Sequence, residues 1–364
     1  MQVTSTSNWI EILTSERPLI DVRAPIEFSK GSFPNAINLP LLVDKEREEV
    51  GTTFKQFGQK AAIECGERLI SPEIKSERTE EWVRFVKSHP DAYLFCARGG
   101  LRSKYSQEWC KEEDVSVPRI EGGYKALRKA VMESFIELCG QTSFVVVAGR
   151  TGIGKTRFLL THENNIDLEG AAGHRGSSFG RGVFEQSTQV NFEHAIAIKL
   201  HRLRSQSNKS FVLLEDEGRT IGRVHVPPAM REAMLKSPLL VLEATLEERV
   251  DNVLQDYVVE LSQKYIEAYG RDDGLKRFGD KHLFSLEKIS KRLGDKDYRM
   301  AKGQLEQAIE DHFKNSDTNH YREFIGLLLT SYYDPMYDYQ LKAKESRIDT
   351  KGRAVELNQW LAQK

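Results

Sequence analysis

The feature that most constrains the fold is an apolar run that leads into a glycine-rich turn, SFVVVAGRTGIGKT at residues 143–156. The turn matches G-x-x-x-x-G-K-[ST], and a helix-compatible stretch follows it, which is the context that this motif requires. Its glycines let backbone N–H groups face phosphate oxygens, while the lysine adds a mobile positive charge and the helix N-terminus adds its dipole. We therefore expect a phosphate loop that binds a phosphate or diphosphate through Gly149, Gly152, Gly154, Lys155 and Thr156.

Acidic residues end a later apolar run, FVLLEDE at residues 211–217. A carboxylate at such a strand end can hold Mg²⁺ through water, beside the hydroxyl of the phosphate-loop threonine. We take Thr156 and Asp216 as the expected metal ligands, with Glu215 and Glu217 open as alternatives at the same strand end. The competing interpretation is a solvated acidic strand end. The motif does not distinguish ATP from another phosphate ligand.

The order of apolar and helical patterns indicates an α/β protein with more than one domain. Short apolar runs alternate with helix-like segments in the first part of the chain, and a further run, PLLVLEA, begins at Pro238. Apolar strands separated by helical stretches are typical of parallel sheets covered by helices. From Thr245 the pattern is helical, and Thr245 and Glu248 have the spacing of a capping box. We expect a parallel-sheet domain, a phosphate-loop NTPase-like parallel-sheet domain and a helical C-terminal extension, at residues 1–140, 141–244 and 245–364.

Length and composition exclude several classes of protein. At 364 residues the chain is long enough for two or three domains. Its net charge of −1 gives no overall attraction to polyanions, so a nucleic-acid partner requires a local basic patch. The four cysteines form no CxxC pair, and no apolar run is long enough to cross a bilayer. Together with an N-terminus that lacks the pattern of a signal sequence, this predicts a cytoplasmic protein without structural zinc or membrane contact.

One cysteine stands in an unusual frame, LFCARGGLRS at residues 94–103. Cys96 follows a short apolar strand and precedes a helix-compatible stretch, so converging loop amides and a helix N-terminus favour its thiolate form. Gly99 and Gly100 permit the backbone angles of a loop whose amides bind a phosphate. Arg98 and Arg102 are placed to hold an oxyanion against the sulfur. The loop predicts a catalytic cysteine that accepts an atom from an anionic donor; the alternative is a buried structural cysteine.

A second glycine-rich segment, DLEGAAGHRGSSFGRG at residues 167–182, lies between the strands of the phosphate-loop region. It is too rich in glycine to be a stable helix, and it carries basic and hydroxyl side chains. We expect a substrate loop that closes on an anionic substrate or an RNA backbone through His174, Arg175, Ser177 and Ser178. The alternative is a solvated surface loop.

Three segments in the first part of the chain together resemble the rhodanese domain. They are PLIDVRAPIEF at residues 18–28, GSFPNAINLP at residues 31–40 and the Cys96 loop. The resemblance implies a rhodanese-like parallel sheet whose loop cysteine carries a chalcogen. Ser32 stands where rhodaneses often have histidine, and the spacing from Cys96 to Arg102 is one residue longer than in the commonest sulfurtransferase loop. A wider loop fits a larger donor than thiosulfate.

A rhodanese domain followed by a phosphate loop, with three further segments, resembles the tRNA 2-selenouridine synthase family. The segments are EGGYKALR at 121–128, HRGSSFG at 174–180 and YYDPMYDYQ at 332–340. The resemblance implies an enzyme that converts the wobble (U34) 2-thiouridine of tRNAs for Lys, Glu and Gln to 2-selenouridine. This family first S-geranylates the base with geranyl diphosphate and then replaces the geranylthio group by selenium from selenophosphate. Cys96 matches the cysteine to which the family mechanism assigns the selenium, and a selenophosphate-producing enzyme is an implied partner.

The helical region supplies the residues that we expect to contact tRNA. Its lysines and arginines would hold phosphates, and Tyr332, Tyr333 and Tyr337 would stack a splayed anticodon base. For these tyrosines the alternative is packing against the phosphate-loop domain.

Two other functions stay open from the residues alone. One is an ATP-dependent tRNA sulfurtransferase, in which Cys96 carries a persulfide and the phosphate loop serves to adenylate the base. The other is a nucleotide-gated binding module whose rhodanese domain is inert. The first requires ATP, and the second predicts an unreactive Cys96.

Overall fold

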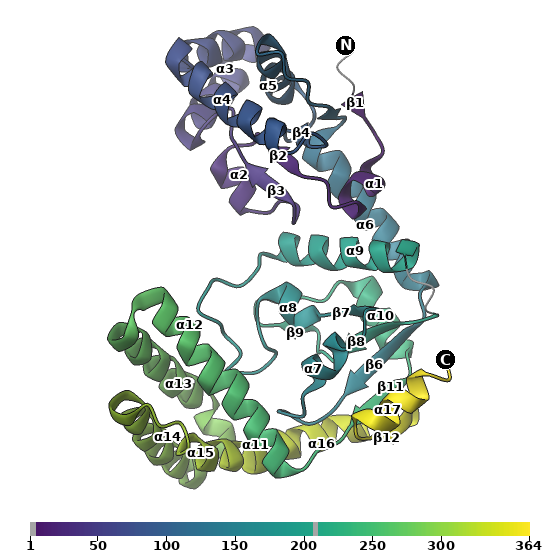
Figure 1. The fold of residues 1–364 in the computed structure, drawn as a ribbon, viewed down its shortest axis with the longest axis vertical. Coiled ribbons are helices and arrows are strands. Elements are labelled where there is room, and N and C mark those ends of the chain that lie inside the picture. Colours follow the sequence, from purple (N-terminus) through teal and green to yellow (C-terminus); the bar gives the residue numbers. More distant parts are fainter. Residues whose placement is uncertain (1–4, 207–209) are drawn as a thin grey trace. The chain divides into compact units, whose positions relative to one another are not determined.

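The computed structural model describes residues 5–206 and 210–364, which form two compact units (Figure 1). The first contains the described residues up to Leu138 together with Thr188–Ser205, and the second contains Cys139–Ser187 with the described residues from Gln206 to Lys364. This division differs from the expected ranges 1–140, 141–244 and 245–364 in two respects. One helix between the phosphate-loop strands belongs to the first unit, and the helical C-terminal region shares the second unit with the phosphate loop.

A five-stranded parallel sheet of order β1-β5-β4-β2-β3 organises the first unit. Its strands are β1 Ser5–Thr6, β2 Leu19–Asp21, β3 Ala36–Asn38, β4 Tyr93–Phe95 and β5 Arg119–Ile120. The inner strands are apolar runs whose side chains are almost fully buried, as in parallel sheets covered on both faces. Cys96 follows the carboxyl end of β4, which is the edge where open α/β sheets bind ligands.

Helices surround this sheet (Figure 1). They are α1 Trp9–Thr14, α2 Pro25–Ser29, α3 Asp44–Leu69, α4 Pro72–Ser88, α5 Leu101–Glu112, α6 Gly123–Gln141 and α9 Gln189–Gln206. Helix α9 is joined to the unit by polar contacts: the Ser32 amide donates to Asn191 Oδ1 at 2.9 Å, and Arg202 Nε donates to the Thr14 carbonyl at 2.9 Å. These contacts explain why a helix from the middle of the chain belongs with the N-terminal sheet.

Helix α3 is a helical hairpin rather than a straight helix. It breaks at Gly58, whose φ of 81° is a conformation that glycine adopts without steric cost. The second half runs back along the first, since Gly66 lies against Val50. Near the turn, Phe54 and Phe57 are exposed, with 55% and 71% of their surface accessible.

A second parallel sheet, of order β12-β11-β6-β8-β7, organises the second unit. Its strands are β6 Phe144–Ala148, β7 Asn165–Ile166, β8 Val212–Glu215, β11 Leu239–Leu242 and β12 Ile348–Gly352. A short antiparallel pair, β9 Thr220–Ile221 and β10 Val224–His225, lies outside it. The three apolar runs recognised in the sequence are the adjacent strands β8, β6 and β11, so the expected α/β class with two parallel sheets is confirmed.

The edge strand β12 is the element that the helical pattern after Thr245 does not predict. It pairs in parallel with β11, and helix α17 Ala354–Leu361 follows it. Its side chains alternate between half-buried and exposed, and its sequence IDTKG lacks the apolar run of a central strand. The expectation of helix was therefore wrong for this stretch, because only pairing with β11 makes it a strand.

Helices also flank the second sheet and build the C-terminal region (Figure 1). They are α7 Lys155–Leu160, α8 Leu168–Ala172, α10 Pro228–Lys236, α11 Leu246–Leu254, α12 Glu260–Tyr269, α13 Arg271–Leu293, α14 Asp295–Asn315, α15 Tyr321–Leu328 and α16 Asp334–Lys342. Single π-helical turns join α11 to α12 and α15 to α16. The capping box is confirmed, since the Glu248 amide donates to Thr245 Oγ1 at 3.2 Å and the Thr245 amide donates to the Glu248 carboxylate at 2.7 Å. None of the described helices is both long and apolar enough to cross a bilayer.

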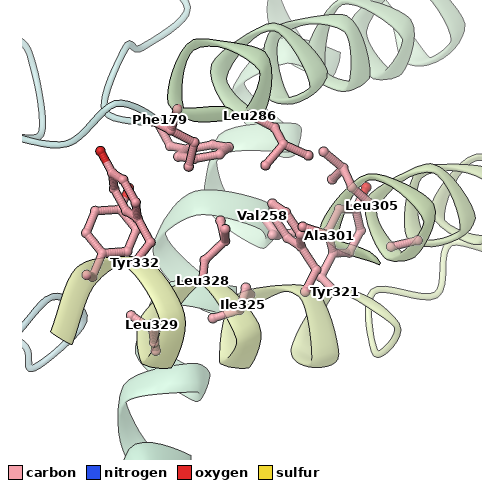
Figure 2. Packing of buried hydrophobic residues seen from close by; sticks show 14 of the residues in the cluster. Phe179, Val258, Leu286, Ala301, Leu305, Tyr321, Ile325, Leu328, Leu329 and Tyr332 are labelled. Atoms are coloured by element: carbon pink, nitrogen blue, oxygen red, sulfur yellow. The ribbon is translucent and has the colours of Figure 1, made fainter. Parts of the chain in front are cut away.

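The core of the helical region reaches into the glycine-rich segment at residues 174–182. Phe179 lies against this core (Figure 2) and contacts Phe324 edge-to-face with ring centroids 6.1 Å apart. Only 6% of Phe179 is exposed, and Lys281 Nζ donates to its carbonyl at 2.7 Å. The glycine-rich segment is therefore anchored by one aromatic side chain, that of Phe179, which has glycines on both sides in the sequence.

We expect Phe179→Ala to release this anchor. Truncating a buried phenylalanine costs about 3–5 kcal/mol, so trypsin should cleave after Arg175 and Arg181 at least about tenfold faster than in the wild type. The control is Phe184→Ala, because Phe184 is 77% exposed. Equal cleavage of the two variants would contradict the anchoring role.

Candidate functional site

Cys96 is buried at the point where β4 passes into the loop before α5. The expected strand is confirmed at Tyr93–Phe95, and the expected helix after the loop begins at Leu101. The Cys96 sulfur lies 3.2 Å from Ser103 Oγ, and this hydroxyl in turn donates to the Gly100 carbonyl at 3.1 Å. The sulfur is thus tied into the first turn of α5.

A distant segment, EGGYK, holds the backbone of the Cys96 loop. The Tyr124 amide donates to the Cys96 carbonyl at 2.9 Å, and the Lys125 amide donates to the Ala97 carbonyl at 3.1 Å. Gly123 has a φ of 58°, and a Cβ there would lie 2.2 Å from the Cys96 carbonyl oxygen. Only glycine permits this approach. These residues belong to the family segment EGGYKALR, but their support of the cysteine loop is not apparent from the sequence.

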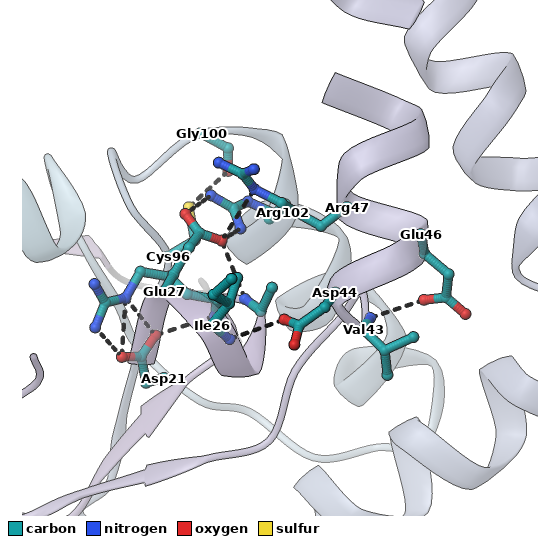
Figure 3. A network of polar contacts seen from close by, with 12 residues as sticks. Asp21, Ile26, Glu27, Val43, Asp44, Glu46, Arg47, Cys96, Gly100 and Arg102 are labelled. Carbon is teal, nitrogen blue, oxygen red and sulfur yellow. Dashed lines mark hydrogen bonds and ion pairs between the residues drawn. The ribbon is translucent and has the colours of Figure 1, made fainter. Parts of the chain in front are cut away.

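The two arginines of the loop have different surroundings. Arg102 forms a two-pronged ion pair with Glu27, with N···O distances of 2.5 and 3.1 Å (Figure 3). Burial alone would raise the pKa of Glu27, but the hydrogen bond and charge of Arg102 hold it below its usual value. Arg98 is exposed and forms no ion pair within the described part of the chain. Arg98 is therefore the loop arginine with a guanidinium available to an anionic donor.

A buried polar network lies behind the loop. Asp21 accepts hydrogen bonds from Arg23 at 2.6 to 3.0 Å and from the Ser32 hydroxyl at 2.9 Å. The guanidinium of Arg23 stacks on Tyr124, 3.8 Å from the ring centroid. Ser32, at the position where rhodaneses often have histidine, thus belongs to this buried network. The network links strand β2 to the EGGYK segment that supports the loop.

The phosphate loop joins β6 to α7 as expected. Gly152 and Gly154 have φ values of 78° and 88°, and a Cβ on Gly152 would lie 2.7 Å from Val253 Cγ2. Lys155 Nζ donates to the Gly149 carbonyl at 3.2 Å, so its ammonium group lies across the loop. These glycines give the backbone the turn that a phosphate-binding ring of amides requires.

A cavity of about 870 Å³ brings the predicted residues of the second unit together. It is lined by the phosphate loop, by His174, Arg175, Ser177 and Ser178, and by Tyr332, Tyr333 and Tyr337. The rings of Tyr332 and Tyr333 are 8% and 7% exposed and pack edge-to-face. This burial agrees with the packing alternative for these two tyrosines.

Three carboxylates converge beside the phosphate loop. Oxygens of Glu169, Glu215 and Glu217 lie within 4.8 Å of one another. Neither carboxylate oxygen of Glu215 has a hydrogen-bond partner among the described residues. Burial and the neighbouring Glu169 raise the pKa of Glu215 to about 7 and that of Glu217 to about 8. Three carboxylates this close together, with Glu215 buried and Lys155 as a neighbouring positive charge, fit a divalent cation next to Thr156.

Asp216 does not join this cluster. Its two oxygens accept hydrogen bonds from Lys344 Nζ at 2.8 and 2.6 Å. The structure therefore assigns the cation-binding geometry to the two alternatives, Glu215 and Glu217, and adds Glu169. Glu169 was not predicted because it lies in the glycine-rich segment and not at the end of a strand. The expectation that this segment is too rich in glycine for helix was wrong at this residue, which lies in the short helix α8.

The expected substrate loop is folded as a compact turn over the cavity. The Arg175 amide donates to the Gly180 carbonyl at 3.0 Å, and a Cβ on Gly180 would lie 1.4 Å from the Arg175 carbonyl oxygen. The Arg175 guanidinium donates to the Asp256 carbonyl at 2.5 Å and lies 5.2 Å from the Tyr257 ring centroid. Burial, with the charges of nearby basic side chains, lowers the pKa of His174. The loop is thus structured by its own backbone and by contacts with the helices.

The YYDPMYDYQ segment braces the phosphate loop. Asp334 forms a two-pronged ion pair with Arg249 at 2.5 and 2.9 Å, and Arg249 Nε donates to the Thr151 carbonyl at 2.9 Å. Arg249 is 2% exposed. A second pair, Arg150 with Asp338 at 2.7 Å, lies at the surface. The segment thus fixes the loop from the C-terminal region.

Known proteins are similar to this chain over nearly its whole length. A family model described as tRNA 2-selenouridine synthase AAA domain matches residues 142–364. The chain is 44% identical to the tRNA 2-selenouridine synthase of Shewanella piezotolerans, over 99% of each protein. It is 43% identical to that of Marinobacter nauticus, over 98% of this chain and 96% of the relative, and 43% identical to that of Shewanella oneidensis, over 96% and 93%.

The chain belongs to the tRNA 2-selenouridine synthase family. It is an enzyme of this family, and the resemblance inferred from the motifs is confirmed. A solved structure of an N-terminal domain from Clostridium difficile 630 is 32% identical with a TM-score of 0.29, and the match covers 32% of this chain and 89% of that one.

We expect Asp334→Ala to destabilise this family member far more than Asp338→Ala. Removing one partner of a buried ion pair costs about 3–5 kcal/mol, because it leaves an uncompensated charge. An exposed pair contributes only about 0–1 kcal/mol, which makes Asp338→Ala the matched control. Urea unfolding of the two variants measures the difference, and equal midpoints would contradict the bracing role of Asp334.

We expect the protein to bind Mg²⁺ more tightly as the pH rises from about 6 to about 8. The raised pKa values of Glu215 and Glu217 mean that the ion must displace protons, and carboxylates bind metals only when they are deprotonated. Calorimetry in buffers of different ionisation enthalpy measures the released protons. Glu217→Gln should weaken binding by about tenfold or more, whereas Glu163→Gln, an exposed residue outside the cluster, should not change it. A pH-independent affinity would exclude these carboxylates as ligands.

Proposed function

We propose that this chain converts the wobble (U34) 2-thiouridine of tRNA to 2-selenouridine in two steps. The base sulfur is first geranylated with geranyl diphosphate, and the geranylthio group is then replaced by selenium from selenophosphate through Cys96. The observation that carries the proposal is that one chain contains both a cavity lined by a loop cysteine and an unpaired arginine, and a second cavity lined by a phosphate loop. The chain is also 44% identical to a relative named tRNA 2-selenouridine synthase. The substrates would be the tRNAs for Lys, Glu and Gln.

The phosphate-loop cavity supports the first step. The diphosphate would lie on the amides of Gly149, Gly152 and Gly154, with Lys155 neutralising its charge. The thiocarbonyl sulfur attacks the first carbon of the geranyl group, the carbon–oxygen bond breaks, diphosphate leaves and the base loses its N3 proton. Apolar side chains in the same cavity, including Leu261 and Met336, offer a surface for the prenyl chain. This assignment makes geranyl diphosphate, rather than ATP, the ligand of the loop.

A divalent cation fits the same cavity. Thr156 with Glu215, Glu217 and Glu169 would hold Mg²⁺, which supplies charge neutralisation for the leaving diphosphate when bound. Lys155 would add a further positive charge beside these carboxylates. The exposed Lys264 and Arg292 also line the cavity and would hold RNA phosphates.

The Cys96 loop supports the second step. S-alkylation turns the C2 sulfur into a good leaving group, so selenium can replace it. The exchange needs no oxidant. The sulfur leaves as geranylthiol, water adds to the phosphorus of the donor, and phosphate leaves while selenium stays on C2. Arg98 and the amides around Gly99 and Gly100 would hold the donor's phosphate, with Arg102 oriented by Glu27. Cys96 lines the same cavity and would hold the selenide-level donor beside C2 during this exchange.

Separate assays of the two steps test the proposal. We expect the Lys155→Ala variant to geranylate a 2-thiouridine anticodon stem-loop at least about a hundredfold more slowly than the wild type, with ATP omitted. It should still selenate RNA that has been geranylated chemically. Cys96→Ser should show the opposite pattern. Wild-type geranylation by Lys155→Ala would exclude Lys155 from diphosphate binding, and a requirement for ATP would favour the sulfurtransferase alternative.

A further inference from the structure

The first unit contains a cavity of about 1260 Å³ that includes Cys96. Polar side chains surround the cysteine, namely Arg98, Arg102, Glu27 and Arg47, and Figure 3 shows how Arg102 and Arg47 meet Glu27. Small-molecule sites usually occupy roughly 300–1,000 Å³. The cavity is therefore much larger than an inorganic donor such as selenophosphate requires.

The rest of the lining carries large apolar side chains among polar ones, which are Glu48, Thr52, Lys55, Gln59, Glu67 and Lys75. The α3 hairpin contributes Val50, Phe54 and Ile63, and helix α5 contributes Leu101, Tyr105 and Trp109. Phe54 and Leu101 are 55% and 37% exposed, which is unusual for large apolar side chains beside a reactive centre. No step that involves only phosphate and selenium uses such a wall, whereas an aliphatic chain would cover it and remove its surface from water.

We propose that this apolar wall, which we call the hairpin wall (Val50, Phe54, Ile63, Leu101, Tyr105 and Trp109), binds the geranyl chain of the S-geranylated base during selenium exchange at Cys96. The inference rests on the proposed function, because it assigns a place to the intermediate of that reaction. The substrate then has two anchors: its C2 atom lies at the cysteine, and its prenyl chain lies along α3 and α5.

Two consequences follow from this binding mode. The geranyl chain identifies the alkylated base, so the unmodified 2-thiouridine, which has no such chain, binds this centre weakly. The hairpin wall also receives the geranylthiol when the C2–sulfur bond breaks, which directs the leaving group away from the selenium donor at Arg98. Selectivity at the second step thus comes from apolar contact and not from base pairing.

The test compares two chemically prepared anticodon stem-loops that differ only in the S-alkyl group, geranyl or methyl. In the selenation assay we expect Phe54→Ala to raise the KM of the geranyl substrate by about tenfold, since the substitution removes an aromatic ring that the geranyl chain would contact. The KM of the methyl substrate should not change. The matched control is Phe57→Ala, because Phe57 lies three residues further along the same helix, is 71% exposed and does not line the cavity.

Each other outcome overturns the inference. Equal loss on both substrates would mean that Phe54 acts on the fold or on the cysteine loop. Loss confined to the geranylation step would mean that the cavity holds geranyl diphosphate instead. No change on either substrate would exclude the hairpin wall. If wild-type protein fails to selenate the geranyl substrate at all, the proposed function fails, and that result differs from a failure of Phe54→Ala alone.

Discussion

The buried ion pair between Arg249 and Asp334 is the interaction on which the second unit depends. Arg249 bonds to Asp334 with both terminal nitrogens and to the Thr151 carbonyl with Nε, so one side chain joins α11, α16 and the phosphate loop. A guanidinium suits this position because its planar donors can serve a carboxylate and a carbonyl at once. With only 2% of Arg249 exposed, a partner is obligatory. The helical C-terminal region is therefore part of the phosphate site and not an appendage to it.

The Cys96 loop is also held by a distant segment of the chain, but through backbone contacts and not through an ion pair. Gly123 approaches the Cys96 carbonyl more closely than any side chain would permit, and the Tyr124 and Lys125 amides bond to the loop carbonyls. In both units a loop that is short in sequence takes its shape from a segment far away in the chain. The two centres also differ in character. One places a soft sulfur beside an apolar wall, and the other gathers carboxylates, a lysine and backbone amides suited to phosphate and a hard cation.

Much of the fold and part of the site arrangement could be predicted from local patterns. The phosphate loop, the strand before Cys96 and the capping box at Thr245 each lie within a few contiguous residues, so the sequence is sufficient to recognise them. The residues that could hold a cation were harder to predict. Asp216 and Glu217 are equivalent in the sequence, and the position of Lys344, over a hundred residues away, removes one of them from the cluster. Strand β12 was missed for a similar reason, since it is polar and exists only by pairing with β11.

The sequence by itself determined the α/β class, the two loops that carry the chemistry, and the family to which the chain belongs. These are properties of glycine spacing, apolar runs and charged residues at fixed offsets, which act through the local backbone. The tertiary structure alone decided which side chains meet: Glu169 with Glu215 and Glu217, Arg249 with Asp334, Gly123 with Cys96, and the α3 hairpin with α5 beside the cysteine. The physical reason is that burial and pairing depend on groups brought together by packing, and no local pattern records which distant residue will be the partner.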